Sequence, residues 1–366
     1  MHVAFVLEQC LSPVPGGTGR YAAELSTALA GRPGMTVSGW VAWHRDVEAA
    51  RRPGVSGPRR LALPRRPLIA AWERGLGPGL RRGNPDVVHA PTLLAPPRGS
   101  RPLVVTIHDA VPWTHPETLT SRGVRWHRAM AERVARTADA VVVPTFAVQR
   151  ALGAHLELPH VAVVGEGVSS QLRSVPADAD ERVRRMELPP SGYLLSLATV
   201  EPRKGLDVLL AALADPAAPD LPLVVIGQAG WGGVDPARMA AELGLSPGRL
   251  RLLGRVPDDD LVVALHGATA LVVPSRAEGY GLPVLEAMAA GTPVVTSDDP
   301  ALVEVGGDAT RQAPVGDAAA LACLLAEVVG DAGMREQMVR AGRERAAVIT
   351  WDSAAEQLVG LYERLG

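Results

Sequence analysis

The chain of 366 residues has a formal net charge of −2 at pH 7 and only two cysteines, Cys10 and Cys323. This length allows two domains that each bury a core, and the absence of a basic excess argues against a nucleic-acid partner. The two distant cysteines exclude a disulfide framework and a cysteine metal site, so we expect a reducing cytoplasm. No apolar run approaches the length of a membrane span, and the apolar start of the chain lacks the basic region of a signal peptide, so we expect no export.

The N-terminal part begins with an apolar strand, Val3–Leu7, followed by Tyr21 and Leu25 at helical spacing. Between them, Gly17 and Gly19 match the start of a dinucleotide-binding fingerprint, but that fingerprint needs a tight turn directly after the strand, and here the glycines come later. The preferred interpretation is a glycine-rich loop over a cleft whose amides bind a phosphate or an acceptor. A mobile surface loop is the alternative.

The segment from residue 45 to residue 82 contains ten arginines against three acids and is the one local charge asymmetry of the chain. It predicts either a solvated surface or a patch that contacts anionic lipid, where each basic residue contributes about 1 kcal/mol. Because no amphipathic apolar face accompanies the arginines, the solvated surface is preferred. A weak peripheral contact with the inner face of the membrane is the alternative.

Three further short apolar runs predict buried strands of a doubly wound parallel sheet, namely Asp86–His89, Leu103–Ile107 and Ala140–Val143. Ligands of such sheets bind at the carboxyl ends of strands. His108 directly follows a predicted strand and precedes a polar loop interrupted by proline, so it is a candidate site residue. His89, at another strand end, fits a structural role.

The helical and strand patterns fade at residues 171–191, where we expect the connection between a first domain of residues 1–170 and a second domain of residues 192–349. Residues 350–366 predict a helix that Thr350 caps and that carries one apolar stripe.

The second domain contains six short stretches that predict strands, namely Tyr193–Ala198, Leu223–Ile226, Leu250–Leu253, Ala270–Val273, Pro293–Thr296 and Thr310–Ala313. In a doubly wound sheet of order 3-2-1-4-5-6, the first and fourth strands are neighbours at the switch point. The loop with Arg203 and Lys204 follows the first run, and the loop with Glu278 follows the fourth. We therefore expect both loops to open into one crevice, where the two cations would neutralise a diphosphate.

The stretch around residue 280 predicts a loop, a helix, a turn and a strand. Gly279 and Gly281 open the backbone before Pro283 starts the helix, and the amides at the helix N-terminus form an anion site. Glu278 lies in the loop and Glu286 about one turn inside the helix, so both carboxylates suit hydrogen bonds to sugar hydroxyls beside a diphosphate.

This stretch resembles the E-x7-E signature of the retaining family-four glycosyltransferases of GT-B architecture, with Glu278 and Glu286 as the two glutamates. Residues 201–206, E-P-R-K-G-L, resemble the diphosphate motif of that family, and His108 resembles its active-site histidine, which hydrogen-bonds the donor sugar. The resemblance implies an α/β fold with two Rossmann-like domains facing a central cleft. It also implies that the acceptor binds the first domain and that the C-terminal helix crosses back to it.

The resemblance implies a hexosyltransferase of cell-envelope glycan biosynthesis that retains anomeric configuration. Mannose from GDP-mannose is the preferred donor, with glucose, N-acetylglucosamine and rhamnose donors as alternatives, and the acceptor is a glycan, a lipid-linked molecule or a small molecule. Glu286 is expected to hold the ribose, Glu278 to orient the hexose, and His108 to steady it from the other domain. The diphosphate is assigned to Arg203, Lys204 and the amides of Gly279, Tyr280, Gly281 and Leu282, and the loop with Gly17 and Gly19 to the donor.

No metal or other cofactor is expected. Asp258–Asp260 contains a D-x-D, which holds a divalent metal in other glycosyltransferases, but it precedes an apolar run and is predicted as a helix N-terminus, as is Asp298–Asp299. The alternative function is a Rossmann-type NAD(P)-dependent sugar-nucleotide epimerase or oxidoreductase that uses Gly17 and Gly19, although a Tyr-x-x-x-Lys pair is missing. A non-enzymatic carbohydrate-binding protein is less favoured, because the charged site residues are all present. The sequence carries no signal for an oligomeric state.

Overall fold

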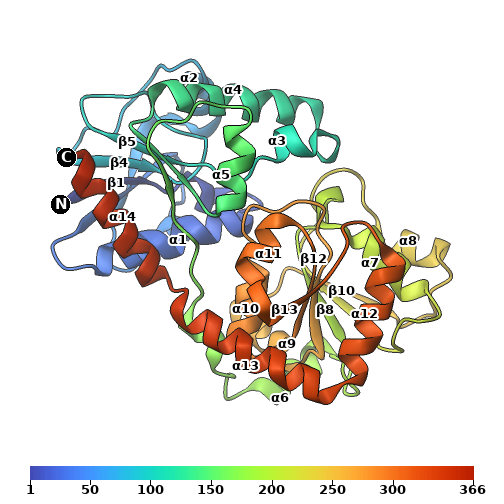
Figure 1. The fold of residues 1–366 in the computed structure, drawn as a ribbon. Helices are drawn as coiled ribbons and strands as arrows, with labels where there is room; N and C mark the ends of the chain where they lie inside the picture. Colours follow the sequence, from blue (N-terminus) through green and yellow to red (C-terminus); the bar gives the residue numbers. More distant parts are fainter. The chain divides into compact units, whose positions relative to one another are not determined.

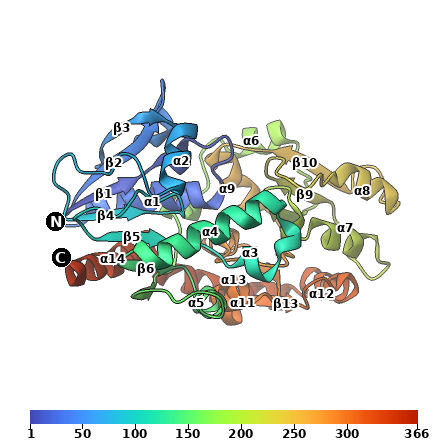
Figure 2. The same cartoon turned by 90° about the horizontal axis from the view of Figure 1, so that it is seen from above.

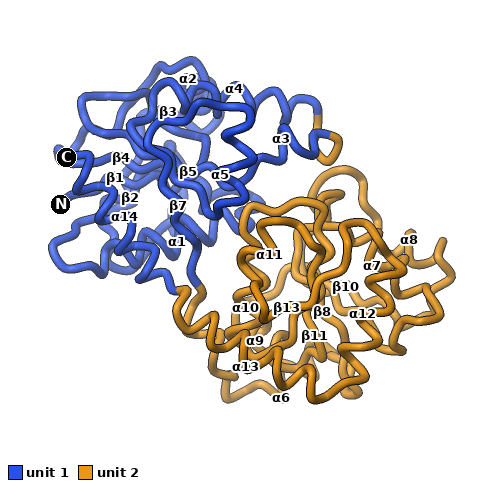
Figure 3. Tube along the Cα trace, viewed as in Figure 1, with its two compact units in different colours: residues 1–116, 121–167, 350–366 blue, residues 117–120, 168–349 orange.

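The computed structural model describes residues 1–366 and divides them into two compact units (Figures 1 and 3). Unit 1 comprises residues 1–116, 121–167 and 350–366, and unit 2 comprises residues 117–120 and 168–349. Each unit is built on one sheet whose strands are all parallel.

Unit 1 has a seven-stranded sheet of order β3-β2-β1-β4-β5-β6-β7. Its strands are β1 (His2–Val6), β2 (Thr36–Trp43), β3 (Ser56–Pro64), β4 (Val87–Ala90), β5 (Leu103–Thr106), β6 (Ala140–Val143) and β7 (Val161–Val163). The four strands predicted in this part of the chain are confirmed within one residue or two at their ends. The sequence analysis did not anticipate β2, β3 and β7.

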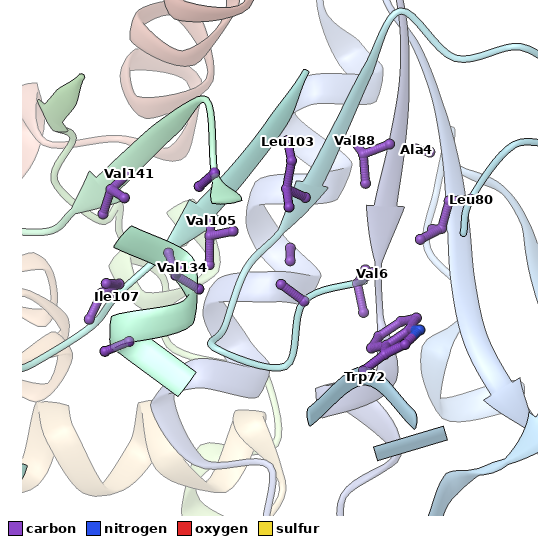
Figure 4. Packing of buried hydrophobic residues seen from close by; sticks show 14 of the residues in the cluster. Ala4, Val6, Trp72, Leu80, Val88, Leu103, Val105, Ile107, Val134 and Val141 are labelled. Atoms are coloured by element: carbon purple, nitrogen blue, oxygen red, sulfur yellow. The ribbon is translucent and has the colours of Figure 1, made fainter. Parts of the chain in front are cut away.

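The helices of unit 1 are α1 (Gly16–Gly31), α2 (Arg65–Glu73), α3 (Val111–Thr114), α4 (Ser121–Thr137), α5 (Phe146–Gly153) and α14 (Trp351–Leu365). Helices α2 and α4 contribute Trp72 and Val134 to a buried cluster on the sheet, where they join Val6 and Leu103 of the strands (Figure 4). Full burial of such side chains stabilises a fold by about 1.5–3 kcal/mol each.

The glycines near the N-terminus do not form the predicted loop. Gly17 and Gly19 lie in the first turn of α1, which starts at Gly16 directly after Pro15. A side chain at Gly19 would place its Cβ 2.4 Å from the Pro15 Cβ, so glycine allows Pro15 to pack closely against this first turn. The arching loop and its alternative, a mobile surface loop, are therefore wrong as predictions for these two residues.

Unit 2 has a six-stranded sheet of order β10-β9-β8-β11-β12-β13, which confirms the predicted order 3-2-1-4-5-6. The strands are β8 (Leu194–Leu197), β9 (Leu223–Ile226), β10 (Leu250–Gly254), β11 (Ala270–Val273), β12 (Val294–Ser297) and β13 (Thr310–Ala313). The helices are α6 (Ala179–Met186), α7 (Leu206–Ala214), α8 (Pro236–Glu242), α9 (Asp258–Gly267), α10 (Leu282–Ala290), α11 (Pro300–Gly306), α12 (Ala318–Gly330) and α13 (Ala332–Val348). The two acidic runs lie at the N-termini of α9 and α11, as predicted.

The segment predicted as a connection, residues 171–191, is structured and belongs to unit 2. Its central part forms α6, which packs against α9. Arg182 and Arg185 of α6 bind the buried Asp260 carboxylate at 2.7 and 2.6 Å. The polar, proline-rich composition suggested a linker because these ion pairs cannot be read from local sequence.

The chain leaves unit 1 after Gly167 and returns to it at Thr350. The Thr350 side chain accepts a hydrogen bond from the Ser353 amide, which confirms the predicted cap, and α14 packs against α1. Helix α14, red in Figures 1 and 2, buries Trp351, Leu358 and Tyr362 in unit 1. None of the helices combines the length and the apolar character needed to cross a membrane.

Candidate active site

In unit 2, the loops after β8 and β11 meet, because these two strands are neighbours in the sheet. Arg203 donates from Nη1 to Glu278 Oε2 at 2.9 Å, and Lys204 donates from Nζ to Glu278 Oε1 at 2.7 Å. The predicted convergence of the two loops is therefore confirmed. The sequence does not predict that Glu278 itself forms ion pairs with both Arg203 and Lys204.

Glu278 is a buried carboxylate. Burial by itself raises its pKa, but Lys204 and Arg203, together with a 2.7 Å hydrogen bond from the Ser275 hydroxyl, outweigh burial and hold the pKa at about 2. Glu278 is thus ionised at any physiological pH, and it fixes the ends of both basic side chains.

Glu201 is a second buried carboxylate of this cluster, and the sequence analysis gave it no role. Its Oε1 accepts hydrogen bonds from Arg203 Nη2 at 2.9 Å and Nε at 3.2 Å. Burial raises the pKa of Glu201. The signal that could have found it is its place in the loop that follows a strand of the switch point, two positions before Arg203.

Helix α10 begins directly after Gly281, whose φ of 97° favours glycine. A Cβ at this position would also lie 2.6 Å from Leu302 Cδ2, so glycine is required for two independent reasons. Tyr280 and Leu282 are buried on either side, and Gly279 precedes them in the loop. The N-terminus of α10 thereby follows directly on the loop that carries Glu278.

Glu286 lies in the second turn of α10 and is buried, with 6% of its surface exposed. It is in the same unit as Glu278, Arg203 and Lys204, as the sequence predicted.

Asp299, the N-cap residue of α11, binds the backbone of the loop that carries Glu278. Its side chain accepts hydrogen bonds from the amides of Ala301 and Leu302 at the start of α11, and from the amide of Glu278 at 3.3 Å. Burial raises the pKa of Asp299 to about 6, and the negative charge of Glu278 adds to this effect. The predicted helix start is correct, but its link to Glu278 depends on the tertiary fold.

A further ion pair fastens the two loops to each other. Arg276 donates from Nη1 to Asp207 Oδ1 at 2.7 Å and to the Pro202 carbonyl at 3.0 Å, while its amide donates to the Arg203 carbonyl at 2.8 Å. The positions of Arg203 and Lys204 are thus determined by backbone contacts as well as by Glu278.

Lys204 is the only lysine among the 37 lysines and arginines of the chain. Its ammonium group has one acceptor in the protein, Glu278 Oε1, although the side chain is only 17% exposed. An ammonium group can donate three hydrogen bonds. Lys204 therefore keeps the capacity for two further acceptors in a largely buried position.

Unit 1 contains the other predicted site residues, His108, Gly17 and Gly19. His108 follows β5 as expected, and its Nε2 lies 2.7 Å from the Pro91 carbonyl oxygen. Its Nδ1 lies 3.4 Å from Glu166 Oε1. Both ring nitrogens thus have partners within unit 1, which the sequence analysis did not foresee.

His89 has a structural role, as proposed from the sequence. Its ring contacts the Tyr362 hydroxyl at 2.5 Å and the Thr106 hydroxyl at 2.9 Å, and it is fully buried. Burial lowers its pKa to about 3, so the ring is neutral. The contact with Tyr362 joins β4 to α14.

Comparison with known proteins shows the family of the chain. Residues 181–345 match the family described as Glycosyl transferases group 1, and residues 15–172 match the one described as Glycosyltransferase Family 4. The O-antigen chain mannosyltransferase B of Escherichia coli is 30% identical over 314 residues, which cover 83% of this chain and 82% of that protein. A phosphatidyl-myo-inositol mannosyltransferase of Mycobacterium tuberculosis is 31% identical and covers 84% of this chain and 83% of its own.

Solved structures share the fold. Sucrose-phosphate synthase of Thermosynechococcus elongatus superposes with a TM-score of 0.79 at 22% identity, over 100% of this chain and 99% of its own. WaaG, a glycosyltransferase involved in lipopolysaccharide biosynthesis, gives a TM-score of 0.71 at 20% identity, over 98% and 99%.

Two parallel Rossmann-like units, one with a cluster of Arg203, Lys204 and two paired glutamates at its switch point, define a glycosyltransferase of GT-B architecture. The chain belongs to glycosyltransferase family 4, and it is mannosyltransferase-like and an enzyme of the hexosyltransferase class. This membership does not favour the alternative of an NAD(P)-dependent epimerase or oxidoreductase.

Proposed function

We propose that this enzyme transfers mannose from GDP-mannose to a glycan, lipid-linked or small-molecule acceptor, with retention of configuration. The observation that carries a nucleotide-sugar donor is the arrangement of Lys204, which is largely buried and has donors for two more acceptors. Diphosphate oxygens are suited to it, because charge-assisted hydrogen bonds are short and strong. The names of the related mannosyltransferases support mannose.

The diphosphate is expected to bind between Lys204 and the N-terminus of α10. Amides at a helix N-terminus carry partial positive charge and bind phosphate groups. As the bond to the sugar breaks, negative charge grows on the leaving diphosphate, and fixed donors at that place stabilise the transition state. Arg203, bound to both Glu201 and Glu278, supplies fixed positive charge in the same cluster.

The two glutamates of α10 and its preceding loop have different roles in this proposal. Glu286 accepts hydrogen bonds from the ribose hydroxyls, and Glu278 orients the hexose while it holds the two cations. His108 of unit 1 contacts the hexose, as the family resemblance implies. The leaving phosphate takes the proton of the acceptor hydroxyl, so no protein base is required.

The reaction is proposed to need no metal ion. Lys204 and Arg203 already supply the positive charge that a metal would bring to a diphosphate. Asp260 of the D-x-D sequence has a structural role in place of metal binding, because it is buried and paired with Arg182 and Arg185 of α6. A cytoplasmic location follows from the use of nucleotide sugars, with at most a weak contact of residues 45–82 with the inner face of the membrane.

The test is a thermal-shift panel of GDP, UDP, dTDP and NAD, each with and without magnesium, on the wild type, Glu286→Ala and Lys204→Gln. A ligand at a hundred times its dissociation constant adds about 2.7 kcal/mol of stability. We expect stabilisation by GDP that does not depend on magnesium and that both substitutions reduce. Stabilisation by UDP alone would replace the donor in the proposal, and stabilisation by NAD alone would refute the nucleotide-sugar site.

A further inference from the structure

The charge on His108 is determined by its two contacts in unit 1. A carbonyl oxygen only accepts hydrogen bonds, so His108 Nε2 donates to the Pro91 carbonyl at 2.7 Å. The other ring nitrogen, Nδ1, faces Glu166 Oε1 at 3.4 Å. Only a protonated Nδ1 interacts favourably with a carboxylate, so the geometry selects the imidazolium form with two N–H groups.

The surroundings of His108 favour this form. Glu166 is only 6% exposed, and a buried carboxylate is stable when a positive charge faces it. Burial of the ring opposes the charged form, but the hydrogen bond and the charge of Glu166 outweigh burial and raise the pKa of His108, with a smaller contribution from Asp109. Two uncharged rings also lie beside His108: the His89 ring, which is neutral, and the Tyr21 ring, which meets His108 edge to face at 4.8 Å.

Glu166 is held firmly although it is the second-last residue before the chain leaves unit 1. The next residue, Gly167, lies directly against the start of α14, where a Cβ would be 2.1 Å from the Trp351 amide nitrogen. The segment by which the chain leaves unit 1 and the segment by which it returns therefore contact each other next to Glu166. This packing fixes the backbone next to Glu166 within unit 1.

We propose that Glu166 is a positioning residue that keeps His108 as an imidazolium, so that His108 serves the donor substrate as a positive charge and never as a base. The contact with the donor rests on the proposed function, whereas the charge state of His108 does not. Glu166 lies outside the family motifs of this chain. Its effect on the reaction acts through the charge of His108.

The charge state is measured by NMR of protein labelled with 15N-histidine, with the His108 signals assigned by their loss in His108→Asn. In the wild type without ligand at pH 7, both ring nitrogens of His108 should be protonated. In Glu166→Gln, we expect a lower pKa and a neutral ring at pH 7 with the proton on Nε2, because the Pro91 carbonyl is unchanged. A neutral His108 in the wild type would overturn the proposal before any variant is made.

Two further variants separate charge from folding. Glu166→Asp keeps the carboxylate and should retain more of the raised pKa than Glu166→Gln, and it can be measured even if the glutamine variant does not fold. Asp109→Asn removes the neighbouring carboxylate and should lower the pKa less than Glu166→Gln does. Equal effects of Asp109→Asn and Glu166→Gln would refute the specific role of Glu166.

The kinetic consequence is a change in pH dependence. The wild type should lose kcat/KM as pH rises through the raised pKa of His108, and in Glu166→Gln this loss should begin at lower pH. An unchanged pH profile, together with the expected NMR result, would leave the charge state correct and refute the action of His108 on the donor. Failure of the nucleotide panel would instead refute the proposed function.

Discussion

Arg203 and Lys204 carry the same charge but are used differently. Arg203 spans two carboxylates, Glu201 and Glu278, and its planar fork suits such a fixed bridge. Lys204 has a single partner and retains donors for a ligand. Arginine therefore organises the site, and lysine is expected to bind the substrate.

Lys204→Gln should lower kcat/KM by about 100-fold or more, the usual effect of removing one donor that stabilises developing charge. The measurement is the initial rate with the donor identified by the nucleotide panel. Arg238→Gln is the matched control, because Arg238 is an exposed cation of unit 2 whose side chain is 68% exposed. A loss of less than threefold in Lys204→Gln would contradict the role of this residue.

Asp299 and Glu278 should give opposite pH dependences of stability. The folded-state pKa of Asp299, about 6, lies above its unfolded value of about 3.9. The folded state then binds more protons between these values, so this residue makes the free energy of unfolding fall as pH rises from about 4 to 6. For Glu278, with a folded-state pKa of about 2, the contribution is present above about 4.3 and is lost as pH falls toward 2.

The variant Asp299→Asn tests this sign, because asparagine keeps a good helix cap but cannot ionise. Relative to the wild type, it should be more stable at pH 7 than at pH 4.5. Urea unfolding at the two pH values gives the comparison. A relative stability that is the same at both would show that Asp299 titrates normally in the fold.

At the scale of single elements, the start of α10 depends on backbone geometry. Gly281→Ala combines a positive φ with a contact of 2.6 Å to Leu302 Cδ2. Gly244→Ala, at a φ of 72° with open space around it, carries the backbone strain alone. We expect the first variant to lose more stability than the second, whose cost is about 1–3 kcal/mol.

Chemical unfolding of both variants measures this difference, and nucleotide binding by Gly281→Ala shows whether the helix start serves the site. Equal losses in the two variants would mean that the Leu302 side chain moves aside freely.

The elements that the sequence revealed are those with strong local patterns. Most of the six strands of unit 2 are short apolar runs, and their order follows from general rules for doubly wound sheets. Strand β2 was missed because Gly39 interrupts its apolar run, and in the fold a Cβ there would lie 2.5 Å from Leu7 Cδ1. Strand β3 contains arginines and prolines, which an edge strand paired only with β2 tolerates.

The sequence predicted which residues of unit 2 form the candidate site, but it did not predict which carboxylates pair with which cations. Arg203, Lys204, Glu278 and Glu286 all lie where the sequence placed them in unit 2. Glu201, Asp299 and Glu166 received no functional role, because a glutamate or aspartate in a loop has the pattern of a solvated residue. Only the tertiary fold buries these carboxylates and gives each its partner.

For the molecule as a whole, we expect the arginine-rich segment, residues 45–82, to determine whether the protein binds a lipid surface. Several of its guanidinium groups bind backbone carbonyls of unit 1, as Arg59 does with Arg82, Arg60 with His44, and Arg74 with Ala70. These contacts favour a solvated surface over insertion into a membrane.

Sedimentation with lipid vesicles checks this expectation. The protein should not bind neutral vesicles, and it should bind anionic ones weakly at low salt and lose that binding at 0.5 M salt, roughly, because surface charges are then screened. Replacing Arg81 and Arg82 by serine should weaken the low-salt binding, while the same change at Arg238 and Arg340 of unit 2 should not. Binding that persists in high salt would indicate apolar insertion.

The solitary lysine gives this enzyme an unusual experimental property. Protein produced with isotopically labelled lysine carries one labelled side-chain amine, that of Lys204. This amine donates a hydrogen bond to Glu278 in the cluster. A reagent that acylates amines can modify only this side chain and the terminal amine of the chain. Protection of Lys204 from such a reagent then reports directly, without any assay of turnover, when the site is filled.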